Sequence, residues 1–135
     1  MKETARNAGL LFLRVMGGAG IAIHGYHKVF GGQMADFAKM AIEPMGFPFP
    51  LVFAYLSGLT EFLGGIFIAV GLATRLAAFP LFFNMCVAVF MVHMRNKDPL
   101  GKMEPALAYL TAVGAILLTG SGAFSLDRII FGKKK

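Results

Sequence analysis

Four long apolar segments alternate with short polar ones along the chain, and this pattern predicts an all-α protein. A helix of about 20 apolar residues is long enough to cross a hydrocarbon core of roughly 30 Å. The predicted spans cover residues 7–26, 51–73, 76–94 and 105–120. Their short connections leave no room for a separate soluble domain. We therefore expect one transmembrane four-helix bundle over residues 1–135.

The polar segments predict further local structure. Residues 33–43 mix polar and apolar positions at helical spacing, which favours a short helix lying in the membrane interface between spans one and two. Three prolines in residues 44–50 exclude a regular helix there. Pro105 is expected to be the first residue of span four. Ser125-Leu126-Asp127 predicts a cap and the first turn of a short terminal helix.

Composition supports the membrane class. The chain is 57% hydrophobic and 15% charged, whereas soluble domains are about 45–50% apolar and about 25% charged. The net charge of +6 is concentrated at the chain ends. Next to apolar spans, such charge indicates anchoring on anionic lipid and not nucleic-acid binding. Lysines and arginines number seven on one side of the predicted bundle and five on the other, which favours cytoplasmic termini.

The single cysteine, Cys86, excludes an intramolecular disulfide and a C-x-x-C redox pair. It falls within an apolar span, where a thiol is expected to be inert. Methionine sulfur beside His93 would suit a soft metal ion. No M-x-x-M series or cysteine pair accompanies it, so we expect no metal site.

Two opposite charges, Arg14 and Glu61, fall inside predicted spans. An isolated ion at that depth costs at least a few kcal/mol, so each is expected to have a partner. Arg14 lies about three residues, or roughly 4.5 Å of helix rise, from the centre of its span. An Arg14–Glu61 pair is therefore expected. It would either line a polar site or proton path, or act as a structural clamp between spans one and two.

Further polar residues fall at one end of the predicted bundle: His24, Lys28, His93 and Glu104. Histidine suits proton exchange near neutral pH, and lysine can hold a carbonyl oxygen or an anion. Since they come from three spans, we expect them to form a pocket. The alternative is that they anchor the helix ends at the headgroup level. With Arg14 and Glu61 they are the candidate site residues.

These residues, in order, resemble the motifs of the DoxX family of small four-span membrane proteins. The matching segments are Leu13-Arg14, His24-Gly25-x-x-Lys28, Glu61-x-x-Gly64-Gly65, Gly71-x-x-x-Arg75, His93, Glu104 and the glycine-rich run from Leu117 to Asp127. The resemblance implies a four-helix bundle in the bacterial inner membrane. Relatives include the small subunit of thiosulfate:quinone oxidoreductase and proteins associated with quinone detoxification and oxidative-stress defence.

Three functions remain open on these grounds. The first is a component of quinone-linked redox or oxidative-stress chemistry, with a quinone in the polar pocket and electrons supplied by a substrate or partner. The second is a non-catalytic assembly or scaffold factor, as the family's distant relatives imply. The third is a carrier of a small solute or ion. The expected partners are the lipid bilayer, a quinone, and further copies of the chain or subunits of a membrane complex.

Overall fold

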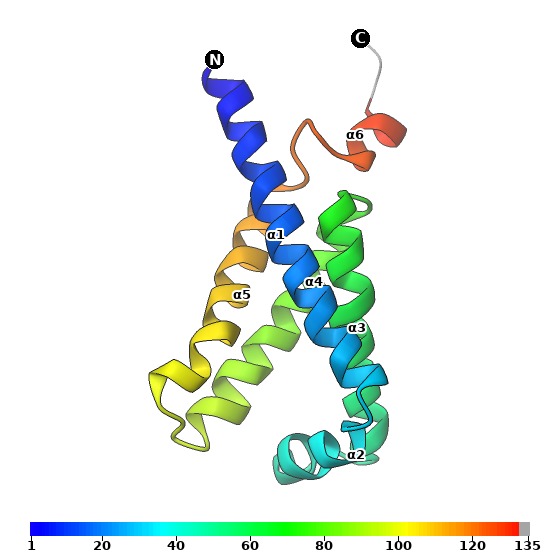
Figure 1. Ribbon diagram of the computed structural model, residues 1–135, viewed down its shortest axis with the longest axis vertical. Coiled ribbons are helices and arrows are strands. Elements are labelled where there is room, and N and C mark those ends of the chain that lie inside the picture. The colour runs from blue at the N-terminus through cyan, green and yellow to red at the C-terminus, as the bar shows by residue number, and fades with distance from the viewer. Residues whose placement is uncertain (133–135) are drawn as a thin grey trace.

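Helices make up nearly all of the backbone in the computed structural model, which describes residues 1–132 (Figure 1). In order, the elements are α1 (Lys2–Phe30), α2 (Met34–Phe37), the π-helical η1 (Ala38–Ile42), the 3₁₀-helical η2 (Glu43–Met45), α3 (Pro50–Val70), α4 (Thr74–Cys86), the π-helical η3 (Val87–Met94), α5 (Leu100–Thr119) and α6 (Leu126–Phe131). No strand occurs in this part of the chain. The all-α prediction is therefore confirmed.

Three helices in the described residues are long and apolar enough to cross a membrane: α1, α3, and the continuous helix Thr74–Met94 formed by α4 and η3. The helix α5, which contains most of predicted span four, is not among them. Large apolar side chains point outward, including Phe12 and Phe83, which are 69% and 68% exposed. An apolar exterior of this kind is stable when the surrounding solvent is lipid.

The helix boundaries differ from the predicted spans in two places. The helix α1 extends beyond both ends of residues 7–26. The helix α5 begins at Leu100, so the prediction that Pro105 starts it is wrong. Pro99, in extended conformation, is the residue before the helix, and Pro105 lies inside it. As the sixth residue of α5, Pro105 lies beyond the first turn and cannot donate the backbone hydrogen bond to the Gly101 carbonyl, yet the helix continues through it.

Two short predicted helices are present. Residues 34–42 form α2 and η1, whose buried face packs Met34, Ala38 and Ile42 against Ala54 of α3. At the other end of the molecule, the Ser125 hydroxyl accepts a hydrogen bond of 3.2 Å from the Arg128 backbone N–H and caps α6. The predicted cap at Ser125 is confirmed.

Glycines allow α1 and α3 to pack in antiparallel contact. A Cβ added at Gly18 would lie 2.6 Å from the Ala69 backbone nitrogen, and one added at Gly65 would lie 2.5 Å from that of Ala22. Both distances are too short for a real side chain, so glycine is required at the crossing. This contact sets the register of the two helices: His24 lies beside Glu61.

The second hairpin, α4 with α5, packs against the first mainly through one half of its length. A buried core joins all four long helices there and consists of Ile21, Ile68, Ala78, Leu81, Val113 and Ile116. Toward the end that carries α2, the two hairpins diverge (Figure 1). The candidate functional site lies at this end of the molecule.

Hydrogen bonds of Asp127 join α6 to the turn between α3 and α4. Its carboxylate accepts hydrogen bonds from the backbone N–H groups of Ala73 (2.6 Å) and Thr74 (3.0 Å), and its own N–H donates to Gly71 O (2.8 Å). Partial burial raises the pKa of the Asp127 carboxyl. The bonds from Thr74 and Ala73, with the nearby Arg14 charge, more than offset this, and the pKa lies below its ordinary value.

We expect Asp127→Asn to lower the free energy of unfolding at neutral pH by about 1–2 kcal/mol, because an amide replaces a charged acceptor of two hydrogen bonds. A depressed folded-state pKa contributes stability above the ordinary value of 3.8, and this stability is lost as the pH falls through the folded-state pKa. Thermal melts from pH 7 to pH 3 should therefore show the two proteins converging at acid pH. A constant difference across this range would contradict the linkage.

Candidate functional site

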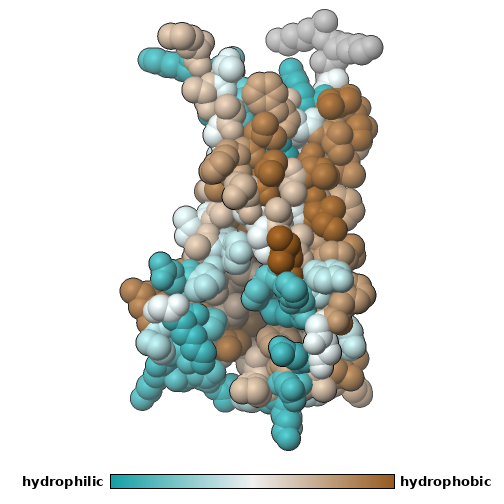
Figure 2. Space-filling model, in the orientation of Figure 1, coloured by the Kyte–Doolittle hydropathy of each residue, from teal (hydrophilic) through white to brown (hydrophobic). Residues whose placement is uncertain are grey.

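A cavity of about 590 Å³ lies between the two hairpins, at the end where they diverge. It is lined by residues of all the long helices and of α2, η1, η2 and η3, and by the loops that join η2 to α3 and η3 to α5. Most of the lining is apolar and includes Phe37, Phe53 and Tyr109. Figure 2 shows hydrophilic residues gathered around a hollow in this half of the molecule, while the other half is mainly hydrophobic.

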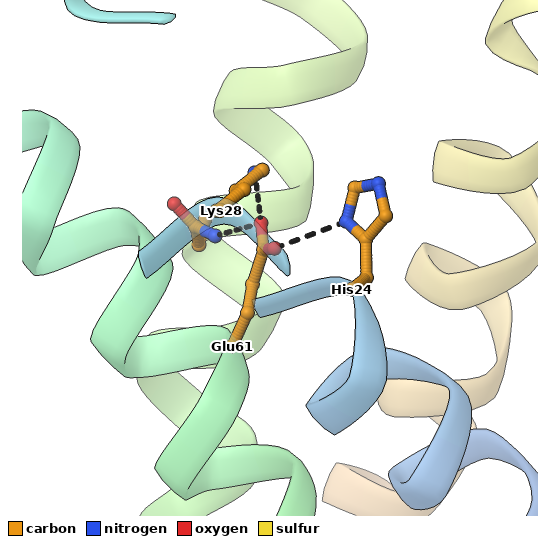
Figure 3. Close-up of polar contacts among 4 residues, drawn as sticks. His24, Lys28 and Glu61 are labelled. Carbon is orange, nitrogen blue, oxygen red and sulfur yellow. Dashed lines mark hydrogen bonds and ion pairs between the residues drawn. The ribbon is translucent and has the colours of Figure 1, made fainter. Parts of the chain in front are cut away.

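Glu61 is the centre of a buried polar cluster on the cavity wall (Figure 3). Its Oε1 accepts hydrogen bonds from Lys28 Nζ at 2.6 Å and from Asn84 Nδ2 at 3.0 Å. Its Oε2 lies 3.1 Å from His24 Nδ1. The Glu61 side chain is 1% exposed, whereas that of His24 is 58% exposed. The cluster thus joins a fully buried carboxylate to a histidine that reaches the surroundings.

Helix geometry explains how these groups meet. His24 and Lys28 are four residues apart in α1, so their side chains share one face. That face meets Glu61 because α1 and α3 are antiparallel and in close contact at Gly25 and Gly58. Lys28 Nζ also lies 4.5 Å from the centre of the Phe37 ring, a cation–π contact that helps to hold the lysine side chain in place.

A second polar cluster lies on the same cavity, at the loop that follows η3. Asp98 Oδ2 lies 2.8 Å from His93 Nδ1, and Asp98 Oδ1 accepts a hydrogen bond of 3.0 Å from Lys102 Nζ. All three residues line the cavity. The hydrogen bond from His93, aided by that from Lys102, holds the pKa of the Asp98 carboxyl below its ordinary value. The cavity therefore has a polar cluster of charged residues at each of two positions.

The structure brings four of the six candidate residues to this cavity: His24, Lys28, Glu61 and His93. Three of them are in direct contact, whereas His93 belongs to the second cluster. Whether they bind a substrate stays a prediction, but the expected meeting of polar groups from several helices is present.

The predicted Arg14–Glu61 pair is wrong. Arg14 is fully buried, and its guanidinium donates instead to the carbonyl oxygens of Ile68 (3.3 Å), Ala69 (3.5 Å) and Phe124. Arg14 lies ten residues, or about 15 Å of helix rise, before His24, which is the residue level with Glu61. The N-terminal part of α1 extends past the end of α3 (Figure 1), so span centres are a poor guide to contacts.

Glu104 does not line the cavity and is exposed. Because α5 begins at Leu100, Lys102, Ala106 and Tyr109 share the face that does line it. Glu104, two residues from Lys102, lies on nearly the opposite side of the helix. Its expected place in the pocket is therefore wrong.

Three residues of the two polar clusters were not predicted: Asn84, Asp98 and Lys102. The sequence contained a signal for Asn84, because a polar amide inside an apolar span needs a hydrogen-bonding partner. It contained no signal for Asp98 and Lys102, because acids and lysines are common in polar loops. In residues 1–132, no three His, Cys, Asp or Glu side chains gather closely enough to hold a metal ion.

Comparison with known proteins identifies the family to which the sequence motifs belong. The sequence profile of the DoxX family matches residues 9–94. A Bacillus subtilis protein named "Putative oxidoreductase CatD" is 31% identical over 131 residues, which cover 94% of this chain and 90% of that protein. "Uncharacterized membrane protein Rv3486" of Mycobacterium tuberculosis is 32% identical over 98 residues, or 64% of this chain and 60% of that protein.

A third relative, an "Uncharacterized protein" of Haemophilus influenzae, is 32% identical over 138 residues, with 97% of each chain covered. No solved structure shows a significant match to the chain.

Proposed function

This chain belongs to the DoxX family of multi-pass membrane proteins, and from that premise we propose that it is a quinone-binding component of a membrane redox system. The observation that carries the proposal is the cavity with its two polar clusters. A quinone head group is flat and apolar, with a carbonyl oxygen at each of two opposite edges. A largely apolar cavity with hydrogen-bond donors at two positions matches that distribution.

The donors present suit carbonyl oxygens. Lys28 and Asn84 supply N–H groups at one cluster, and His93 and Lys102 supply them at the other. A volume of about 590 Å³ lies within the range of about 300–1,000 Å³ that is usual for small-molecule sites. Lipid-facing residues such as Leu56 and Phe83 also line the cavity, which supports entry of an apolar ligand from the bilayer.

Quinone reduction to the quinol consumes two electrons and two protons. In this proposal, Glu61 and His24 hold and pass protons: the carboxylate is buried beside the cavity, and the histidine is half-exposed. Asn84 and Lys28 orient the carboxylate. The chain has one cysteine and therefore no dithiol that could supply two electrons. The electrons would come from a partner subunit or a bound reductant, which makes this chain one part of a complex.

The proposal includes a topology. The helix α5 packs alongside α4 and contributes Val113 and Ile116 to the shared core, which supports a fourth span. The start of α1, the start of α4 and α6 lie at one end of the molecule (Figure 1), and these segments contain Lys2, Arg6, Arg75 and Arg128. The count of seven basic residues against five that the sequence predicts, which includes the three C-terminal lysines, favours the cytoplasm for this end. The termini would then be cytoplasmic and the cavity would lie toward the outer face of the bacterial inner membrane.

The test is calorimetric titration of the purified, detergent-solubilised protein with decylubiquinone, a short-tailed quinone. Lys28→Met and His93→Ala are each expected to raise the Kd for the quinone by roughly tenfold. Each removes a hydrogen-bond donor to a quinone oxygen from one of the two charged clusters. Glu104→Gln changes a charge on α5 outside the cavity and should leave the Kd unchanged.

Unchanged affinity in both cavity variants would reject this site. No binding to the wild type, together with copurification of a specific larger partner, would favour an assembly factor. Solute uptake into proteoliposomes that depends on Glu61 would favour a carrier.

A further inference from the structure

A second hollow, of about 560 Å³, lies at the end of the molecule opposite the quinone cavity. Its walls are the α3–α4 turn, the end of α5, the glycine-rich linker that follows, and α6. It is lined by two arginines, Arg75 and Arg128, and by the hydroxyl residues Thr74, Thr119 and Ser121. Arg75 and Arg128 enter the proposed topology, but none of these residues lines the proposed quinone cavity.

The local charge of this hollow favours an anion. Asp127 is the one acid among its lining residues, and its carboxylate is engaged by the backbone N–H groups of Ala73 and Thr74. The two guanidinium groups carry five N–H donors each. Within residues 1–132, the Arg75 guanidinium donates one hydrogen bond, of 3.0 Å, to Leu118 O, and the Arg128 guanidinium donates none. Donors therefore remain for a ligand.

An unpartnered buried hydroxyl provides an independent sign of a ligand. Thr74 lines the hollow at the first turn of α4 and is 1% exposed, yet its Oγ1 has no hydrogen-bonding partner within 3.5 Å in residues 1–132. The neighbouring Asp127 carboxylate, which the Thr74 side chain helps to keep ionised, is already held by two backbone N–H groups. A buried hydroxyl without a partner costs free energy. A phosphate oxygen at this helix N-terminus would accept its hydrogen and would also gain from the helix dipole.

Apolar residues beside the arginines distinguish a lipid from a free anion. Leu76 and Phe131 line the hollow and are 78% and 69% exposed, and Ile129 of α6 is 77% exposed. Such side chains are stable only against acyl chains or another apolar surface. We propose that this hollow binds the phosphate of an anionic phospholipid, held by Arg75, Arg128 and Thr74, with Leu76 and Phe131 against its acyl chains.

The experiment is native mass spectrometry of the full-length protein in mild detergent, with added phosphatidylglycerol or phosphatidylcholine. The wild type should retain phosphatidylglycerol preferentially. The Arg75→Gln/Arg128→Gln variant should lose that preference by roughly tenfold or more, because each basic group near an anionic lipid surface contributes several-fold in affinity. Arg95→Gln, at the opposite end of the molecule, is the matched control and should retain it.

Arg128→Gln alone and Thr74→Val provide variants that keep the Arg75–Leu118 contact, so a folding defect can be separated from a binding defect. Both should weaken lipid retention while circular dichroism shows unchanged helix content. Equal lipid preference in the double variant and the wild type would overturn the proposal. Displacement of the lipid by millimolar inorganic phosphate would also overturn it, since it would indicate a site for the free anion.

Discussion

Glu61→Leu is expected to lower the free energy of unfolding by about 3 kcal/mol, because it leaves a partly buried cation and a partly buried amide without their acceptor. Lys28 Nζ and Asn84 Nδ2 both donate to Glu61 Oε1. The Lys28 side chain is 19% exposed, so water still solvates part of its ammonium group. The expected loss of stability is therefore smaller than for a fully buried ion pair. The measurement is thermal or denaturant unfolding in detergent, followed by circular dichroism.

A double-mutant cycle separates the ion pair from simple loss of packing. Lys28→Met in the Glu61→Leu background removes the uncompensated charge and should restore most of the lost stability, because replacing both ions by apolar groups is often close to neutral. If the double variant loses the sum of the two single losses, the residues are not coupled and the contact at 2.6 Å is not formed in the membrane protein.

Glu61→Gln addresses the proposed chemistry separately from folding. The amide keeps the size of the carboxylate and one acceptor oxygen for Lys28, but it carries no charge and cannot exchange a proton. We expect a folded protein that still binds the quinone, but in which chemical reduction of the bound quinone takes up protons at least roughly tenfold more slowly. An equal rate of proton uptake in Glu61→Gln and the wild type would contradict a role for Glu61 in proton exchange.

Arg14→Leu is expected to lower the free energy of unfolding by about 3 kcal/mol and to loosen the linker that precedes α6, because it removes the donor to one buried and two partly buried carbonyl groups. Two of these carbonyls, of Ile68 and Ala69, belong to the last turn of α3, and the third belongs to Phe124 in the linker. Arginine can serve all three because its planar guanidinium carries several fixed N–H donors. Limited proteolysis between Gly120 and Ser125 should accelerate in the variant.

Arg14→Lys and Arg6→Leu are the matched variants. Lysine keeps the charge but not the planar set of donors, so its stability should fall between those of the wild type and Arg14→Leu. Arg6 lies in the same helix, but it is exposed and pairs with an exposed glutamate, so Arg6→Leu should change stability little. Equal proteolysis rates in Arg14→Leu and the wild type would show that Arg14 does not hold the linker.

The hydrophobic pattern was sufficient for the fold class and for most helices. Long apolar segments in a membrane protein must be helical, because no water is available to bond their backbone groups. Local signals also placed the short helix over residues 34–42 and the Ser125 cap correctly. Helix ends were less well predicted, as Pro105 shows: a membrane helix can contain a proline beyond its first turn when its surroundings satisfy the freed carbonyl, so a proline does not define the first residue.

The candidate site was predicted in part for a related reason. His24 and Lys28 share a helix face by their spacing, and buried Glu61 needed partners; both facts follow from the chain alone. Which partner Glu61 takes depends on how far α1 slides along α3. The glycine contacts between Gly18 and Ala69 and between Gly65 and Ala22 set that offset, and no single-helix pattern contains it.

The sequence by itself determined that this protein is helical, that its long helices are suited to lipid, and that its internal charges need partners. Each of these follows from properties of single residues or single helices: hydropathy, spacing and the free energy of a buried ion. Only the tertiary structure decided that Glu61 meets His24, Lys28 and Asn84, that Arg14 holds the α6 linker, and that Glu104 faces away from the cavity. These depend on helix register and rotation, which arise from close packing between distant segments.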